Sequence, residues 1–334
     1  MTTPPTTITV RAPHDLIAAS AVVLGFWPTE SIVLLTFAGA EQFHARVDLP
    51  DDPVDLPAVT QLLLAPVLQH RVERVAVLVF CDDERRVALV WRSLRDAFAA
   101  RGVVIVDALR ADGRRWYPLA GGDRRLREIG VAYDLEAHPF LAQAVFSGRI
   151  TRRSRDDLAA SLDSDPAGVL EVERAATALA ARRPCFDAVE ASLGEVLAEG
   201  EWVRSLVRRH VAAGSVCSDA ETARLLWGMQ QPRVRDAAWS TLRRDRARES
   251  VEFWTDIVRR TPNWLLVAPA TLLGWSAWQS GNGALAWCAL DRALDVDSEY
   301  GLATLLSGAL TRAVPPSAWD DLCVEAWSEG LDVG

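Results

Sequence analysis

The chain has 334 residues, of which 50% are hydrophobic and 24% are charged, and its net charge is −9 at pH 7. This composition is typical of a folded globular protein, and the length allows two domains of ordinary size. The acidic balance argues against a dedicated nucleic-acid-binding protein. All 36 basic residues are arginine, which excludes a Gly-Lys-Ser/Thr phosphate loop and a Schiff-base lysine.

The cysteines and the N-terminus indicate where the protein resides. The five cysteines are scattered, and no two are spaced as C-x-x-C. They therefore predict neither a disulfide framework nor a metal site, and no motif for a cofactor is present. No charged segment followed by an apolar core opens the chain, and no apolar run reaches membrane-spanning length. We therefore expect a cytoplasmic protein without a membrane partner.

The first 135 residues alternate between strand and helix patterns. Strands are expected at 6–11, 31–37, 43–49, 74–80 and 103–109. Helices are expected from Pro13 to about Leu24, at 57–69 and at 82–101. This alternation predicts an α/β domain over residues 1–135, with a mixed sheet of about five strands. The hairpin of the second and third strands supplies an antiparallel pair.

Residues 136–334 have the hydrophobic period of helices, which predicts an all-α domain of helical hairpins. Helices are expected at 139–148, 154–163, 167–182, 186–213, 219–230, 234–247, 250–260, 265–280, 283–295, 299–312 and 317–328. Ten of the thirteen tryptophans follow His138. At helical spacing they indicate packing in a hydrophobic core rather than a cofactor-binding site.

The segment 264–312 is similar to a tetratricopeptide repeat. Gly274 precedes a turn at 281–283, and the helix after the turn has one face formed by Ala286, Leu290 and Ala293. Small residues at such positions allow two antiparallel helices to approach closely. The tryptophan, tyrosine and proline of the consensus are missing. The pattern therefore predicts a helical hairpin more strongly than a peptide-binding groove.

The end of the chain and the arginine clusters suggest surfaces. Residues 317–334 carry five acids and no base, with an apolar stripe at Trp319, Cys323 and Trp327. We expect this stripe to dock on the helical domain or on a second subunit. Arginines in the loop 110–127 could bind an anion or an acidic partner, whereas the neighbouring acids favour a solvated surface.

Two places carry candidate functional residues. The strand at 43–49 has a polar face of His44, Arg46 and Asp48, which could bind a phosphate or support acid–base chemistry. Alternatively, Arg46 and Asp48 pair with each other at a solvated face. His14 and Asp15 open the first helix, at a strand-to-helix turn where α/β proteins often place ligands. Alternatively, Asp15 only caps that helix.

Several stretches suggest a family. The run DLIAASAVVLGFWPTESIVLLTF followed by RVDLP resembles the N-terminal signature of an actinobacterial family, domain of unknown function 4192. RADGRRWYPL, HPFLAQAVFSGRITRRSRDDLAASL and GNGALAWCALDRALDVDSEYGLATLL also match. The resemblance implies a cytoplasmic protein with an α/β front, a helical back and no established reaction. The matching positions are Asp15, Gly25, Phe26, Pro28, Ser31, Arg46, Asp48 and Pro50.

Polar members of this set suggest a buried network. Asp15, Ser31, Arg46 and Asp48 could hydrogen-bond one another around the turn between helix and strand. The leading hypothesis is a non-enzymatic regulatory or scaffolding protein that binds a protein partner, or itself, through its helical domain. The alternative is an enzyme or small-anion-binding protein with a site at the strand ends, formed by His14, Asp15, Ser31, His44, Arg46 and Asp48.

Overall fold

The computed structural model describes residues 10–37, 43–135, 138–146, 150–181 and 192–319. The chain forms two compact units. The first comprises Met1–Asp157 and Thr311–Pro315, and the second comprises Leu158–Leu310 and Pro316–Gly334. The first unit therefore extends beyond the boundary expected after residue 135.

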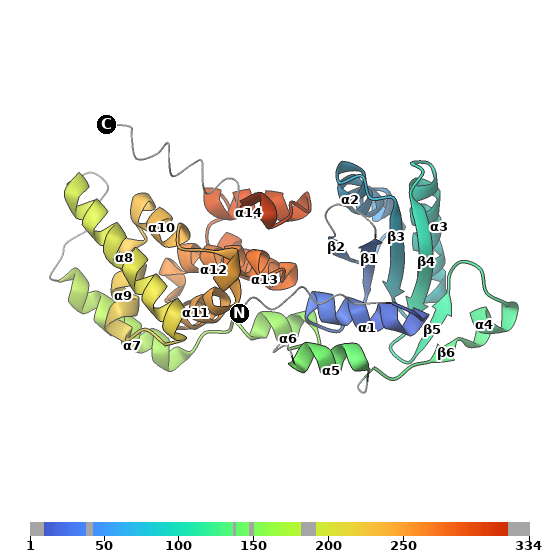
Figure 1. Ribbon diagram of the computed structural model, residues 1–334, viewed down its shortest axis with the longest axis horizontal. Coiled ribbons are helices and arrows are strands. Elements are labelled where there is room, and N and C mark those ends of the chain that lie inside the picture. Colours follow the sequence, from blue (N-terminus) through green and yellow to red (C-terminus); the bar gives the residue numbers. More distant parts are fainter. Residues whose placement is uncertain (1–9, 38–42, 136–137, 147–149, 182–191, 320–334) are drawn as a thin grey trace. The chain divides into compact units, whose positions relative to one another are not determined.

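A mixed six-stranded sheet forms the centre of the first unit (Figure 1). Its strands are β1 (Ser31–Phe37), β2 (His44–Asp48), β3 (Arg74–Phe80), β4 (Val104–Ala111), β5 (Arg115–Pro118) and β6 (Val131–Ala132), in the order β2-β1-β3-β4-β5-β6. Only β3 and β4 are parallel, and every other neighbouring pair is antiparallel. The predicted mixed sheet and its antiparallel hairpin are confirmed.

The first and last strands differ from the prediction. Residues 6–9 of the strand expected at 6–11 lie outside the described residues, and Val10 and Arg11 are not in a strand. Strands β5 and β6 were not predicted. The chain reverses after β4 at Gly113, whose φ of 89° favours glycine. The Asp112 carboxylate stabilises this turn by accepting the N–H groups of Arg114 (2.8 Å) and Arg115 (2.6 Å).

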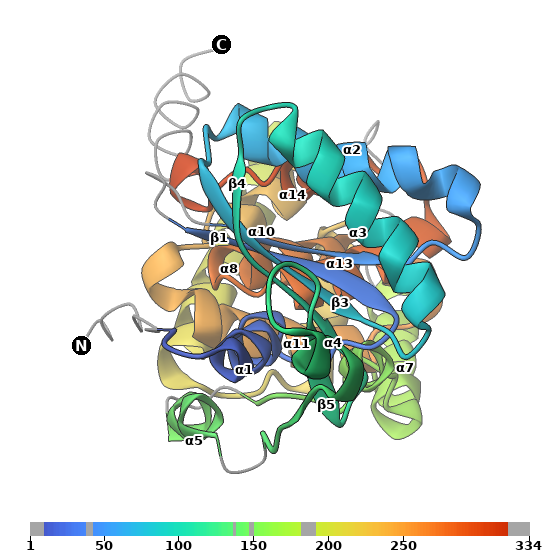
Figure 2. The same ribbon diagram turned by 90° about the vertical axis from the view of Figure 1, so that its right-hand side faces the viewer.

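Helices cover both faces of the sheet. Strands β1, β3 and β4 lie between α2 (Leu56–Gln69) and α3 (Glu84–Ala99) on one side and α1 (Pro13–Leu24) on the other (Figure 2). Alternate residues along each strand face the core beneath α2 and α3, among them Ile32, Leu34, Val77 and Val79. The intervening residues, such as Val33 and Leu78, are also fully buried. Strands buried on both faces explain the continuous apolar runs in the sequence.

Two short helices complete the first unit. These are α4 (Arg124–Ile129) and α5 (Pro139–Phe146), and α5 packs against α1. Helix α4 was not predicted. It begins where the Asp123 carboxylate accepts the N–H of Leu126 (2.7 Å), and it ends at Gly130.

The described part of the second unit contains helices and no strand, as predicted. Its helices are α7 (Pro166–Ala180), α8 (Leu193–Ala213), α9 (Asp219–Gly228), α10 (Pro232–Trp239), α11 (Ala247–Arg260), α12 (Val267–Gln279), α13 (Gly283–Val296) and most of α14 (Gly301–Thr311), while α6 (Arg155–Ala160) crosses the boundary between the units. The helix expected at 234–247 is wrong in its second half, because α10 ends at Trp239 and a 3₁₀ turn at Arg244–Arg246 precedes α11. Among the helices described in both units, none combines the length and apolar character needed to cross a bilayer.

Helices α12 and α13 form the predicted hairpin. Gly281 has a φ of 78°, and the Asn282 side chain accepts the N–H of Leu285 to begin α13 (3.0 Å). A Cβ placed on Gly274 would lie 3.4 Å from Leu290 Cγ and 3.5 Å from the Ala286 carbonyl oxygen. The missing side chain of Gly274 therefore allows the two helix backbones to approach closely.

Trp319 is the described member of the apolar stripe near the C-terminus. Its ring centroid lies 4.6 Å from that of Trp239 and 4.7 Å from that of Trp275. This residue thus docks on the helical unit of its own chain. Cys323 and Trp327 lie outside the described residues.

We expect Gly274→Val to destabilise the second unit by about 1–3 kcal/mol, because overpacking forces the helices apart. Urea unfolding followed by tryptophan fluorescence measures this change. Gly283→Val is the matched control, since the nearest atom to a Cβ there is Leu310 Cδ2 at 4.0 Å. Its unfolding free energy should change by no more than about 0.5 kcal/mol. Equal effects of the two substitutions would contradict the close approach.

Candidate functional site

Asp15 completes the start of α1. Its Oδ2 atom accepts the backbone N–H groups of Arg11 (2.7 Å) and Ala12 (3.0 Å). The first N–H groups of a helix have no partner within it. A carboxylate in the first turn also interacts favourably with the positive end of the helix dipole. The helix-capping alternative for Asp15 therefore describes half of its contacts.

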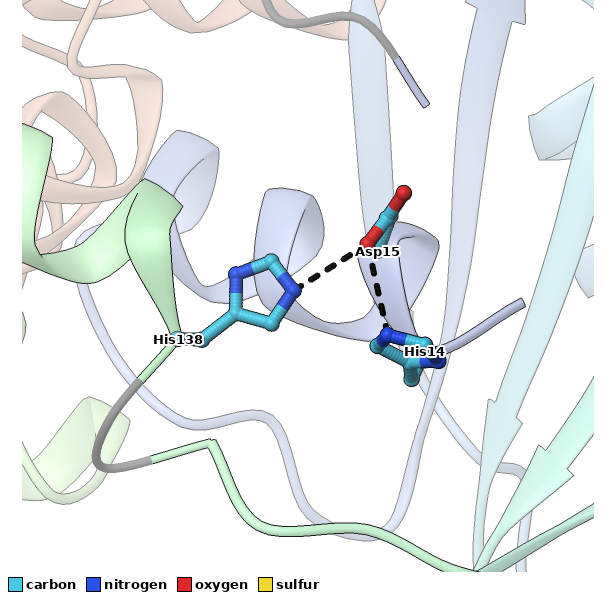
Figure 3. A group of neighbouring side chains, drawn as sticks. All are labelled: His14, Asp15 and His138. Carbon is cyan, nitrogen blue, oxygen red and sulfur yellow. Dashed lines mark hydrogen bonds and ion pairs between the residues drawn. The ribbon is translucent and has the colours of Figure 1, made fainter. Parts of the chain in front are cut away.

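The other carboxylate oxygen of Asp15 contacts two histidines (Figure 3). His138 Nε2 lies 3.1 Å from Oδ1, and His14 Nε2 lies 3.6 Å from the same atom. The two imidazole rings meet edge to face, with centroids 5.7 Å apart. His14 comes from α1, whereas His138 immediately precedes α5 and is buried.

The surroundings of His138 determine which ring nitrogen carries the proton. Its Nδ1 atom lies 3.2 Å from the backbone nitrogen of Phe140, a group that can only donate. Nδ1 is therefore the acceptor, and a neutral ring carries its proton on Nε2. That proton points at Asp15 Oδ1. The histidine thus links the start of α5 to the start of α1.

This tautomer opposes metal binding at the same three residues. One ligand atom each from His14, Asp15 and His138 lies within 4.8 Å of the others. A metal at His138 Nε2 would require the proton to move to Nδ1, where it would face the N–H of Phe140. One of two donors would then lose its acceptor in a buried position, at a cost of about 1–3 kcal/mol. The geometry therefore favours a hydrogen-bonded contact between helices.

The ionisation of Asp15 follows from these contacts. Burial raises the pKa of Asp15, but the hydrogen bonds from Arg11, Ala12 and His138 outweigh burial, so its pKa lies below the ordinary value of 3.8. The carboxylate is consequently ionised throughout the neutral range.

A second group of candidate residues lies on the β1–β2 hairpin. Arg46 Nη2 pairs with Asp48 Oδ1 at 2.6 Å, and the Asp48 side chain is 82% exposed. The Arg46 guanidinium also lies over the Phe26 ring, 5.9 Å from its centroid. Two polar atoms of this group are buried without a hydrogen-bond partner, Arg46 Nε and Ser31 Oγ. Ser31 faces Asp48 in the strand register, so it shares a sheet face with Arg46.

The two groups do not form one site. Asp15 lies in the first turn of α1, whereas Phe26 follows Gly25, the residue that ends this helix. Ten helical residues span about 15 Å at 1.5 Å per residue. Of the predicted network of Asp15, Ser31, Arg46 and Asp48, the pair of Arg46 and Asp48 is confirmed, whereas Ser31 Oγ has no partner and Asp15 contacts the two histidines instead.

His44, the remaining candidate, pairs with Leu35 in the strand register, and its side chain is exposed. The ion pair between Arg46 and Asp48 is the part of this strand face that the sequence anticipated.

The carboxyl end of β3 is where an α/β protein would hold a phosphate. Here the Asp83 side chain accepts the N–H groups of Arg85 (2.8 Å) and Arg86 (3.2 Å) and fills the start of α3. The Arg86 guanidinium donates to Glu30 Oε2 (2.7 Å) and to the Leu49 carbonyl (3.0 Å). The contacts of Arg86 connect α3 to the ends of β1 and β2, and Asp83 takes the N–H groups that a phosphate would otherwise use.

The arginine-rich loop contributes to the fold in a similar way. Arg110 is buried, stacks over Tyr117 at 3.9 Å, and donates to the Asp82 carbonyl (3.2 Å). Arg115 donates to the carbonyls of Ile129 (3.0 Å) and Gly130 (3.1 Å). The contacts of these two arginines join β4, β5 and α4, which favours a role in the fold.

His138 is the functional-site residue that sequence reasoning missed. It lies 123 positions from Asp15, and no spacing rule relates the two. The available signal was its position in HPFL, a stretch that matches the family pattern and precedes a helix.

Fold and site together define a two-unit protein, in which an α/β unit with hydrogen-bonded polar clusters precedes a helical unit. The chain matches a family described as a domain of unknown function (DUF4192) over residues 13–317, and it belongs to that family. Comparison with curated proteins and with solved structures gives no match.

We expect Asp15→Ala to lower the free energy of unfolding by about 1–2 kcal/mol at pH 7, because N–H groups lose their acceptor. The pKa of Asp15 is lower in the folded protein than its ordinary value. The charge therefore contributes fully to the free energy of unfolding above the ordinary pKa, and this contribution disappears as the pH falls through the folded pKa. The difference from wild type should therefore shrink below about pH 4. Urea unfolding at several pH values measures it.

His14→Ala is the control for this prediction. His14 is exposed, so its removal should change the free energy of unfolding by no more than about 0.5 kcal/mol. A larger effect for His14→Ala than for Asp15→Ala would contradict the assigned role of the carboxylate.

Proposed function

We propose that this protein is a non-enzymatic regulatory or scaffolding protein that binds a protein partner through its helical unit. Two observations support the proposal. Asp15 and Arg86, two charged groups well placed for chemistry, are engaged in contacts between segments of the first unit, and Arg46 pairs with Asp48 on its own strand. Large apolar side chains are exposed on both units, and among the described tryptophans Trp264 of the second unit is the one in this exposed group.

The observation that carries the proposal is the position of Trp264. Its side chain lies in the 3₁₀ turn Asn263–Leu265 before α12 and is 58% exposed. The ring stands edge to face on Trp227 of α9, with centroids 6.5 Å apart. Tryptophans are enriched among the residues that dominate protein interfaces, because they bury much area with few rotatable bonds. An exposed indole held by a second indole fits a preorganised anchor.

The helical arrangement is compatible with a tetratricopeptide-like surface. Helix α12 packs against both α11 and α13, and the α12–α13 turn and close approach follow the repeat pattern. Other pairs, such as α8 with α10 and α7 with α9, join helices that are not consecutive, which is unlike a simple stacked array. We further propose that the protein acts in the cytoplasm of an actinobacterium, as the sequence resemblance implies.

We expect Trp264→Ser to abolish partner binding without unfolding the protein. Tagged wild-type chain should capture the same protein in repeated affinity purifications, and the variant should lose it. Leu62→Ser in α2 is the matched control, because it removes another exposed apolar side chain from the first unit. Analytical ultracentrifugation tests whether the partner is a second copy. Loss of binding in both variants, or in neither, would contradict the proposal.

A second candidate function, binding of a small anion, has a specific observation in its favour. Arg46 Nε and Ser31 Oγ are buried donors without an acceptor, and they share one face of the β1–β2 hairpin. Buried polar groups are usually paired, so an unpartnered pair is informative. A phosphate or sulfate oxygen could accept from both, whether the anion is a ligand or part of a substrate.

For this candidate, we expect sulfate to raise the unfolding temperature of wild type more than chloride does at matched ionic strength. Arg46→Met should lose that difference. Ser31→Ala should weaken the sulfate effect, and without anion it should be neutral or stabilising by up to about 1 kcal/mol, since an unpartnered hydroxyl is removed. Differential scanning calorimetry measures all three proteins. Marked destabilisation by Ser31→Ala without anion would contradict an unpartnered hydroxyl.

A further inference from the structure

Three clusters in the described residues place ligand atoms of histidine, cysteine, aspartate or glutamate close together. The cluster around Asp15 has the wrong histidine tautomer for a metal. In the second, Glu30 already pairs with Arg86 at 2.7 Å and accepts from the Cys81 thiol at 3.7 Å. The third cluster joins the end of α8 to the start of α9 and consists of His210, Cys217 and Glu221.

The tautomer of His210 is opposite to that of His138. Its Nδ1 atom lies 3.2 Å from the Ser215 carbonyl oxygen and 2.9 Å from the Ser215 hydroxyl. A carbonyl can only accept, so Nδ1 carries the proton. Its Nε2 atom lies 3.3 Å from Arg209 Nη2, which can only donate, so Nε2 presents its lone pair. Histidines that ligate metals are held in this way, with the second ring nitrogen donating to a carbonyl or carboxylate.

The lone pair of His210 points into the cluster. Nε2 lies 3.7 Å from Glu221 Oε2, and one atom from each of the three residues lies within 4.8 Å of the others. In a tetrahedral zinc site with bonds of about 2.0–2.3 Å, ligand atoms stand about 3.3–3.8 Å apart. Small side-chain rotations therefore reach the required spacing. Cys217 is 3% exposed and His210 is buried, so both ligands lie largely out of water.

A cationic group already lies against two members of the cluster. Arg209 Nη2 lies 2.7 Å from Glu221 Oε1 as well as 3.3 Å from His210 Nε2. The Arg209 side chain is mostly exposed, so it can turn into solvent and leave both ligand atoms accessible. The site therefore accommodates positive charge, and its present cation can be replaced.

We propose that His210 Nε2, Cys217 Sγ and Glu221 Oε2 bind a divalent cation of the zinc type, with water as the fourth ligand. Imidazole, thiolate and carboxylate are the donors that zinc takes in proteins. The Cys217 thiol releases its proton to solvent on binding, so the thiolate and the Glu221 carboxylate balance the two positive charges of the metal. The bound metal fixes the α8–α9 turn. This site goes beyond the proposed partner binding and does not depend on it.

Cobalt(II) is the probe for the proposed ligands. The full-length chain is freed of metal with a chelator and titrated with Co²⁺. We expect one equivalent to bind and to produce a thiolate-to-cobalt charge-transfer band together with the visible bands of a tetrahedral centre. Zn²⁺ should then displace the cobalt, so that its absorption bands disappear. It should also raise the unfolding temperature, since it binds the folded state.

Four variants test the assignment. Cys217→Ser should abolish the charge-transfer band and weaken the affinity for cobalt by on the order of 100-fold or more. This exceeds the effect of removing a group that only hydrogen-bonds a metal ligand. Glu221→Gln keeps the capping interaction with Ser218 but removes the anionic ligand, so the fold persists while affinity falls. Arg209→Met removes the competing cation and should tighten binding. Asp15→Ala should leave cobalt binding unchanged.

The outcome for Arg209→Met separates a metal site from a structural cluster. A variant that merely disturbed packing would weaken binding, whereas removal of a competing cation strengthens it. The proposal is overturned if the wild-type chain binds no cobalt, if Cys217→Ser retains the charge-transfer band, or if Arg209→Met weakens binding. Circular dichroism of each variant confirms that the helices remain folded.

Discussion

The first unit depends on the hydrogen-bond acceptor that Asp15 supplies at the start of α1. Helix α1 is buried along most of its length from Leu16 onward, whereas its first turn is only partly buried, and the N–H groups at its beginning have no partner within the helix. Asp15 supplies the missing acceptor, with one oxygen for backbone N–H groups and the other for His138. A single carboxylate thus serves both the helix start and its neighbour α5. Its charge is stabilised by these donors, which explains why an acid is tolerated in this partly buried position.

The need to pair donors with acceptors also explains why residues of catalytic or anion-binding type in the first unit are compatible with a structural role. A histidine beside an aspartate resembles an acid–base pair, yet the proton of His138 is fixed by the N–H of Phe140. An arginine near an acid resembles an anion clamp, yet Arg86 is shared among loop carbonyls and Glu30. Residue type alone does not separate these cases. The donors and acceptors that surround each group do, because they fix which atom has a free lone pair.

Sequence reasoning succeeded where a pattern is local. The strands at 31–37 and 74–80 are continuous β-branched and apolar runs, and their bounds agree with those of β1 and β3. Alternation along β2 correctly anticipated the pairing of Arg46 with Asp48. The turn expected at 281–283 correctly anticipated the α12–α13 hairpin, which the Asn282 cap then completes.

Sequence reasoning failed where a contact joins distant parts of the chain. Strands β5 and β6 are too short to show a period, and β5 exists because the turn at Gly113 returns the chain to β4. His138 and Asp15 are 123 positions apart, and only the tertiary fold brings them together. The third metal-type cluster was overlooked for a related reason. Its ligands are separated by the α8–α9 turn, which brings Cys217 back onto the last turn of α8, where no short motif would place it.

Helix α9 connects the two proposals made for the helical unit. Glu221 lies in its first turn, and Trp227, which supports the exposed Trp264, lies in its last. Ten residues span about 15 Å, so a constraint at one end of this rigid element reaches the other without any change in fold. A metal at the start of α9 would restrict fraying of the helix and thereby the orientation of Trp227. Since binding costs less entropy when an anchor is already ordered, metal occupancy would favour partner binding through preorganisation of Trp264. The two sites would then be coupled through α9, while each remains separately testable.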